Sequence, residues 1–185
     1  MPACQPLRKP IPRIWLMTDP RLGDELLASI QRLPMGSGVI FRHYQLDATQ
    51  RRKLFAKVRR VCAKRGHIVF LAGDGATARA WHADGVHGRR RSASLHLHSA
   101  PVHNAREIAA AKRFRADILF LSPLRATQSH PGNRPLGPVR FKTLAKMCQP
   151  AKVIALGGMN RAQAAKWPRS LVHGWAAIDA FRTQD

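Results

Sequence analysis

The side chains best suited to chemistry come directly after predicted strands. Arg42 lies near the end of one strand, Asp74 stands in a Gly-Asp-Gly turn, and Gly157-Gly158 open the turn after a third strand. A guanidinium can bind phosphate, a carboxylate can bind Mg²⁺, and glycines let the backbone approach an anion closely. Each has a structural alternative: Arg42 could be an ion-pair partner, Asp74 a cap, and the glycines a tight turn.

Histidines form a second candidate cluster. His96 and His98 share one face of a predicted strand, and His103 follows a few residues later. Zinc binds such imidazole clusters, usually with further firm ligands. The alternative, which we favour, is a set of polar histidines at the rim of the fold. The sequence contains no Ser/His/Asp triad, P-loop or Rossmann glycine fingerprint.

Charge is the outlying property of this chain. Its 32 Lys and Arg against 10 Asp and Glu give a formal net charge of +22, which attracts polyanions such as nucleic acid, acidic membranes or phosphorylated small molecules. Eight basic residues fall on one predicted helix between Arg51 and Arg65, with Phe55 the only aromatic among them. Because interleaved aromatics are missing, we interpret this helix as a solvated outer face. Nucleic-acid binding is therefore possible but not favoured.

Short β-rich runs alternate with helical patterns along the whole chain. Repeated βα units imply a parallel sheet, and eight strands favour a closed (β/α)8 TIM barrel over an open doubly wound sheet. Active sites of such barrels lie at the C-terminal ends of the strands. The predicted strands are 13–19, 38–44, 67–72, 85–87, 93–98, 117–122, 152–156 and 171–178.

The totals predict one domain over residues 1–185, with residues 1–12 as a basic N-terminal extension. No stretch approaches the ~18–20 apolar residues that a membrane helix needs, and the extension lacks the apolar segment of a signal peptide. We therefore expect no membrane partner. Three distant cysteines form no disulfide framework, which fits the cytoplasm.

Several strand ends, taken together and in order, resemble the thiamine phosphate synthase/TenI family. Each match is weak alone, but Ala-Asp-Gly-Val-His and Ile-Ala-Leu-Gly-Gly-Met at the right points of a βα series are fairly specific together. The resemblance implies a barrel that joins an aminopyrimidine pyrophosphate to a thiazole phosphate, with Mg²⁺. The TenI branch instead catalyses a thiazole tautomerisation or has no known reaction. The matching segments are 16–20, 83–87, 116–123, 126–127 and 154–159.

On the pyrimidine side the resemblance is incomplete. The family's Gln-x-Arg-x-Lys falls at Ile40, Arg42 and Tyr44, so only the arginine is retained for the pyrophosphate. Of Asn-Asp-Asp after the third strand only the last residue, Asp74, remains as the implied Mg²⁺ ligand. The second metal carboxylate falls near Ser92 in this chain.

On the thiazole side the resemblance is better. Thr127 and Ser129 match a Thr-x-Thr pattern, and Gly157 and Gly158 match the phosphate-binding turn. The phosphate-binding lysine after the sixth strand is replaced by His130. In addition, a serine of the last strand is replaced by Asp179, and a carboxylate pointing inward there would repel phosphate. The interval from His87 to His103 is about half the family's usual length, which predicts one helix deleted after strand 4.

The favoured hypothesis is a thiamine phosphate synthase-like transferase of thiamine biosynthesis that releases pyrophosphate. In it, Arg42, Asp74 and His130 are catalytic, and Thr127, Ser129, Gly157 and Gly158 bind phosphate. The partners are phosphorylated thiazole and pyrimidine small molecules, and the oligomeric state is open. One alternative is a TenI-like non-synthase, either a thiazole tautomerase or a ligand-binding regulatory barrel. Another is a basic polyanion-binding protein on a relic barrel.

Overall fold

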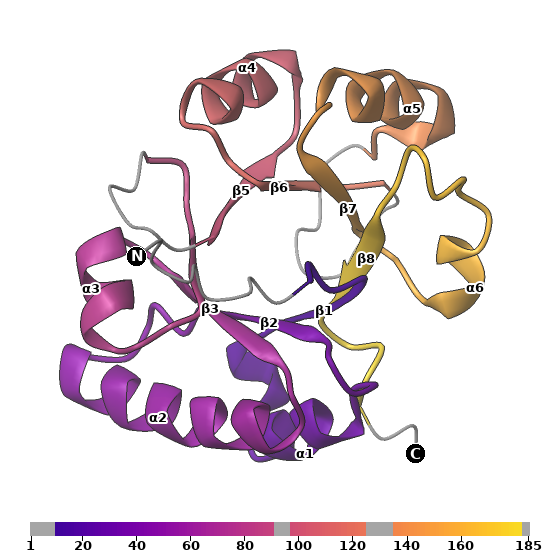
Figure 1. Cartoon of the computed structure of the whole chain (residues 1–185). Helices are drawn as coiled ribbons and strands as arrows, with labels where there is room; N and C mark the ends of the chain where they lie inside the picture. Colours follow the sequence, from indigo (N-terminus) through magenta and orange to yellow (C-terminus); the bar gives the residue numbers. More distant parts are fainter. Residues whose placement is uncertain (1–9, 91–96, 125–134, 183–185) are drawn as a thin grey trace, which may run out of the picture.

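The computed structural model describes residues 10–90, 97–124 and 135–182. Its eight strands form one closed parallel barrel in which each strand pairs with its neighbours in chain order and β8 pairs with β1 (Figure 1). The predicted (β/α)8 TIM barrel is therefore confirmed. The strands are β1 (Ile14–Met17), β2 (Gly38–Phe41), β3 (Ile68–Ala72), β4 (Gly85–His87), β5 (Leu97–Val102), β6 (Ile118–Leu121), β7 (Lys152–Leu156) and β8 (Gly174–Ala177).

Helices cover the outside of the barrel (Figure 1). They are the short 3-10 helix η1 (Pro20–Leu22) and α1 (Glu25–Arg32), α2 (Ala48–Lys64), α3 (Gly75–Ala80), α4 (Ala105–Arg113), α5 (Gly137–Met147) and α6 (Arg161–Ala164). As predicted, Asp47 caps α2 by accepting a hydrogen bond from the Gln50 amide at 2.9 Å. Gly66 follows α2 with a φ of 65°, where glycine carries little strain.

The connection between β4 and β5 spans only residues 88–96, of which 91–96 lie outside the described part. Its shortness agrees with the predicted loss of a helix there. The fifth strand runs to Val102 and therefore extends further along the chain than the predicted 93–98. The prediction ended too early because Pro101 argues against a strand, yet this residue sits in register with Phe120 of β6.

The core has two layers, one inside the barrel and one between the barrel and the helices. Inside, the Trp15 ring meets Phe70 and Phe120 edge-on, at centroid distances of 5.2 and 5.4 Å. Outside, α2 buries Phe55, Val58 and Cys62 against the strands. Among the described helices, none is long and apolar enough to cross a membrane.

Candidate active site at the C-terminal rim

Four neighbouring strands, β7, β8, β1 and β2, end on one arc of the C-terminal rim. Their pairing brings residues from opposite ends of the sequence to one arc, with the predicted phosphate-binding turn after β7 at one end and Arg42 after β2 at the other. We call these residues the rim arc: Gly157, Gly158, Asp179, Asp19, Arg21 and Arg42.

Arg42 is held rigidly at the end of β2. Its Nε donates to the Thr18 carbonyl at 2.7 Å, its Nη2 donates to Asp19 Oδ2 at 2.8 Å, and its backbone amide donates to Thr18 Oγ1 at 3.0 Å. The side chain is 21% exposed, and its Nη1 has no hydrogen-bond partner among the described residues. Arg42 is thus an ion-pair partner, as the structural alternative predicted, and it still has a guanidinium edge that could contact an anion.

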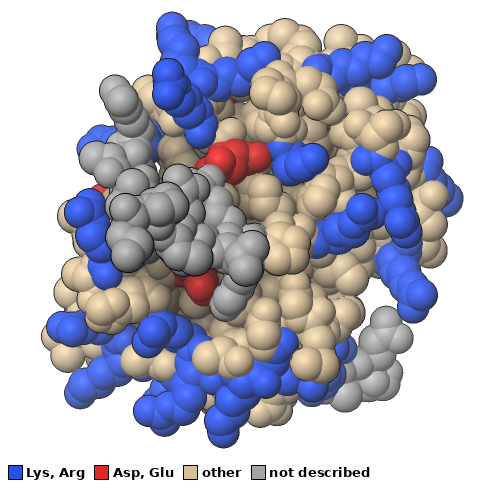
Figure 2. Space-filling model, in the orientation of Figure 1, with Lys and Arg blue, Asp and Glu red and all other residues tan. Residues whose placement is uncertain are grey.

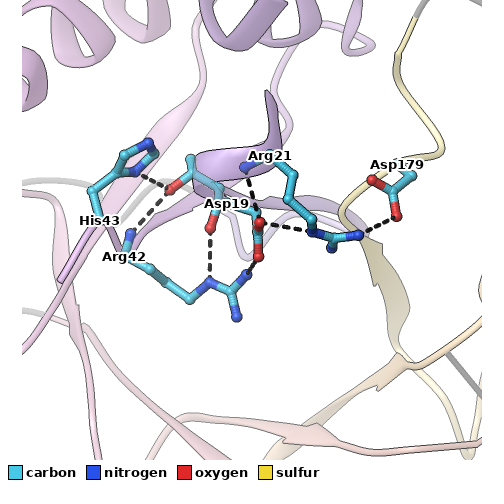
Figure 3. A network of polar contacts seen from close by, with 6 residues as sticks. Asp19, Arg21, Arg42, His43 and Asp179 are labelled. Carbon is cyan, nitrogen blue, oxygen red and sulfur yellow. Dashed lines mark hydrogen bonds and ion pairs between the residues drawn. The ribbon is translucent and has the colours of Figure 1, made fainter. Parts of the chain in front are cut away.

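Asp19 is the centre of the rim arc (Figure 3). Its Oδ1 accepts from Arg21 Nε at 2.9 Å, while its Oδ2 accepts from Arg42. Burial by itself would raise the pKa of Asp19, but the hydrogen bonds from Arg21 and the charges of both arginines outweigh it and hold this pKa below its usual value. The carboxylate is therefore ionised at neutral pH and keeps both guanidinium groups in place.

Asp179 does not stand alone at the end of β8. Arg21 Nη1 lies 3.7 Å from Asp179 Oδ2, so Arg21 bridges the two carboxylates of the arc (Figure 3). The phosphate repulsion expected from Asp179 is accordingly offset by a cation. Arg21 was not selected from the sequence, because it lies in a short turn helix after β1 and only the fold brings it to β8.

Gly157 and Gly158 form a turn that other residues would not form easily. Their φ angles are 99° and 62°, and a Cβ on Gly157 would lie 2.9 Å from Pro123 Cα. The turn therefore packs tightly on the segment after β6, where the Leu124 amide donates to the Leu156 carbonyl at 3.0 Å. That segment continues into the predicted site residues Thr127, Ser129 and His130, which lie outside the described residues.

Asp74 acts as a helix cap in this structure. Its Oδ1 accepts from the Thr77 amide at 2.8 Å and its Oδ2 from Thr77 Oγ1 at 2.7 Å. These hydrogen bonds lower the pKa of Asp74 below its usual value. In the described part of the chain, no group of three or more His, Cys, Asp or Glu residues could hold a metal. Mg²⁺ can be held by one or two carboxylates together with substrate oxygens, so it stays a prediction from the resemblance.

Arg51 is a site residue that sequence reasoning assigned to a solvated helix. From α2 its guanidinium donates to the Arg42 carbonyl at 2.8 and 3.0 Å and to the Ala72 carbonyl at 2.6 Å. It also lies 5.2 Å from the centre of the Tyr44 ring. Arg51 therefore ties the ends of β2 and β3 together directly behind Arg42.

Three histidines in the described residues contact other groups of the protein and are not hydrogen-bonded to one another. His87 Nδ1 lies 2.9 Å from Ser99 Oγ, His98 Nε2 lies 2.9 Å from the Gly88 carbonyl, and His103 Nδ1 lies 2.8 Å from the Ser122 carbonyl. This arrangement agrees with the favoured interpretation of polar histidines at the rim. His96 lies outside the described residues.

Comparison with known proteins identifies the family. The model of the thiamine monophosphate synthase family matches residues 14–181. The chain belongs to this family. "Putative thiamine-phosphate synthase 2" of Aquifex aeolicus is 27% identical, over 92% of this chain and 98% of its own length.

Two solved structures of proteins named thiamine phosphate pyrophosphorylase share the barrel fold. Thiamine phosphate pyrophosphorylase from Pyrococcus furiosus superposes with a TM-score of 0.74 and 22% identity, covering 95% of this chain and 89% of its own. The protein of the same name from Bacteroides thetaiotaomicron gives a TM-score of 0.59 and 16% identity, with 90% and 82% covered. These similarities support the fold rather than the activity.

We expect one buried histidine to make this thiamine monophosphate synthase family member less stable in acid. Burial, with smaller effects from the charges of Arg42 and His98, lowers the pKa of His87 from 6.5 to about 3. Below pH 6.5 the unfolded chain takes up a proton that the folded chain refuses, so stability falls as the pH drops toward 3. Burial lowers the pKa of His43 and His67 as well, which adds to the same trend.

We expect His87→Asn to remove part of this acid sensitivity. Each refused proton costs up to about 1.4 kcal/mol per pH unit, so the variant should lose about 1 kcal/mol less per unit between pH 6 and 4.5. Guanidinium chloride unfolding across this range measures the difference. His82→Asn, at an exposed position, is the matched control. Equal slopes for His87→Asn and the wild type would show that His87 is not the sensor.

Proposed function

We propose that this chain is a thiamine phosphate synthase-like enzyme that couples hydroxymethylpyrimidine pyrophosphate to thiazole phosphate and releases pyrophosphate. The observation that carries the proposal is the Arg42 guanidinium, anchored by Asp19 and Thr18 with an edge free at the rim. The family membership of residues 14–181 and the name of the Aquifex aeolicus relative support the same reaction.

Arg42 would act on the leaving group. The bond between the pyrimidine methylene carbon and the pyrophosphate oxygen breaks, and the oxygen keeps the electron pair. A thiazole nitrogen then forms the new bond to this carbocation-like carbon. A guanidinium does not lose its proton in proteins, so Arg42 can stabilise the negative charge that develops on the pyrophosphate without acting as an acid.

The thiazole phosphate would bind at the other end of the rim arc. The Gly157-Gly158 turn offers backbone amides without side chains in the way. Arg21 would offset the negative charge of Asp179 beside that turn, and Thr127, Ser129 and His130 would complete the site. Both substrates would then approach the same arc from opposite sides.

A TenI-like non-synthase is the second candidate, and two observations favour it. Ile40, which replaces the family's glutamine, is fully buried in the barrel interior and offers no polar group. Asp74, the predicted metal ligand, has both carboxylate oxygens hydrogen-bonded to Thr77. A barrel that keeps only the thiazole phosphate half would show these features.

The decisive assay follows thiamine phosphate formation from the two purified substrates, with Mg²⁺ or with a chelator present. Product that forms with the wild type supports the synthase. If the folded protein binds thiazole phosphate but forms no product, the synthase proposal is wrong and the TenI-like function takes its place. Mg²⁺ dependence of the product is the test of the predicted metal.

The variant Asp74→Ala tests whether Asp74 is only a helix cap or also a metal ligand, and Asp47→Ala is its matched control. Both aspartates cap a helix through the amide three residues on, so each substitution should cost about 1 kcal/mol of stability. Activity lost only in Asp74→Ala would give this residue a role in the reaction beyond capping. Equal activities in the two variants would restrict Asp74 to capping.

A further inference from the structure

A second concave surface lies on the outside of the barrel, away from the proposed active site. It is a groove between α2 and α3 with a volume of about 420 Å³, in the size range of ligand sites. One wall carries Arg52, Arg59 and Arg60 of α2, and the other carries Trp81 and His82 at the end of α3. No residue of the rim arc lines this groove.

The α2 wall is a row of uncompensated cations. α2 holds eight basic residues through its C-cap Arg65 and no acidic residue after its capping Asp47. Within the described residues, Arg52, Arg59 and Arg60 are exposed and have no hydrogen-bond or ion-pair partner. In Figure 2, Lys and Arg side chains gather along the lower edge of the molecule, where α2 lies in Figure 1. Like charges spaced along one helix destabilise it, and a bound polyanion would remove that cost.

The spacing of these arginines suits an extended anion. Arg52 and Arg59 are seven residues apart, so their backbones are about 10 Å apart along the same side of the helix. A single small phosphate would occupy one end of such a row, whereas a chain of phosphates can contact its whole length.

Trp81 supplies the aromatic surface that α2 itself lacks. Its partly exposed ring lines the groove, packs 5.5 Å from the buried Phe55 ring and lies 5.7 Å from the Arg51 guanidinium. Bases of single-stranded nucleic acid stack on such aromatic side chains while cations contact the phosphates. A membrane surface fits less well, because none of the exposed large apolar residues, Met35, Tyr44, Val139 and Met147, lines the groove.

From these observations we infer that the groove between α2 and α3 binds single-stranded RNA, with Arg52, Arg59 and Arg60 on the phosphates and Trp81 stacked on a base. This binding is independent of the proposed synthase activity. The groove and the rim arc share no residue, so the arginine variants of the groove replace no residue of the arc. Trp81 does lie against Arg51, which holds the Arg42 carbonyl, so the arginine variants are the ones that separate the two functions.

The test is fluorescence anisotropy of a labelled twelve-nucleotide oligouridylate, titrated at several salt concentrations. The groove variant combines Arg52→Gln, Arg59→Gln and Arg60→Gln. The control variant combines Arg113→Gln, Lys142→Gln and Lys146→Gln, which removes the same three charges from exposed positions on α4 and α5. We expect the groove variant to lose at least about tenfold in affinity and to lower the salt slope by about 2, at ~0.7 per phosphate contact.

The control variant should lose far less affinity than the groove variant. Equal losses of affinity in the two variants would mean that the net charge of +22 attracts RNA without a defined site, and would contradict binding in the groove. The proposal would also be wrong if the wild type failed to bind oligouridylate at 100 mM salt. It would equally be wrong if the groove variant lost binding to anionic vesicles but kept its binding to RNA.

Trp81→Leu tests the stacking separately from the charge. It should weaken oligouridylate binding at least about fivefold and leave the binding of inorganic polyphosphate, which has no bases, unchanged. Equal losses for both ligands would contradict base stacking.

Discussion

Arg42→Gln should reduce the rate of thiamine phosphate formation by about two to three orders of magnitude, the usual cost of removing one preorganised group that stabilises developing charge. Glutamine can still donate a hydrogen bond but carries no charge. The effect should appear in kcat at saturating substrates, because the charge on the leaving pyrophosphate grows as its bond to carbon breaks. Steady-state kinetics with both substrates measures it.

Two further variants distinguish the charge of Arg42 from its position. Arg42→Lys keeps the charge but loses the two anchored nitrogens, so we expect an intermediate rate. Asp19→Asn keeps the guanidinium but loses the ion pair at 2.8 Å, so we expect a smaller fall of about tenfold. A rate within threefold of the wild type for Arg42→Gln, in a folded protein, would remove Arg42 from the reaction.

The sequence predicted the barrel well because the signals for it are local and repeated. Strand runs, capping residues such as Asp47 and the glycine after α2 each depend on nearby residues only, and eight successive strand runs all indicate the same fold. The fifth strand was placed too early because Pro101 is a local signal against a strand. Pairing with β4 and β6 overrode this signal.

The site was predicted less completely because its partnerships join distant parts of the chain. Arg42 was selected from its strand end, but its anchors Thr18 and Asp19 lie in the turn after β1. Arg21 and Arg51 were missed for the same reason, since each acts on a strand end far from its own helix. Asp74 was selected from the sequence, but its carboxylate suits both a metal site and a helix cap. Only its contacts with Thr77 show that it caps α3.

Gly38 also depends on a contact between distant parts of the chain, and we expect it to tolerate no larger side chain. Gly38 is paired with Trp15 across β1 and β2, and a Cβ at this position would overlap the Trp15 ring. The ring cannot move aside easily, because its Nε1 donates to the Pro12 carbonyl at 2.8 Å and Phe70 and Phe120 contact it edge-on.

Gly38→Ala should therefore lower the free energy of unfolding by about 3 kcal/mol or more, at the upper end of overpacking costs. Gly66→Ala is the matched control: it has a positive φ but nothing within 4 Å of its Cβ, so it should cost only about 1–2 kcal/mol. Chemical denaturation measures both. Combining Gly38→Ala with Trp15→Phe should cost less than the sum of the two single changes, because the smaller ring leaves room for the methyl group. Additive costs would mean that the Trp15 contact is not the cause.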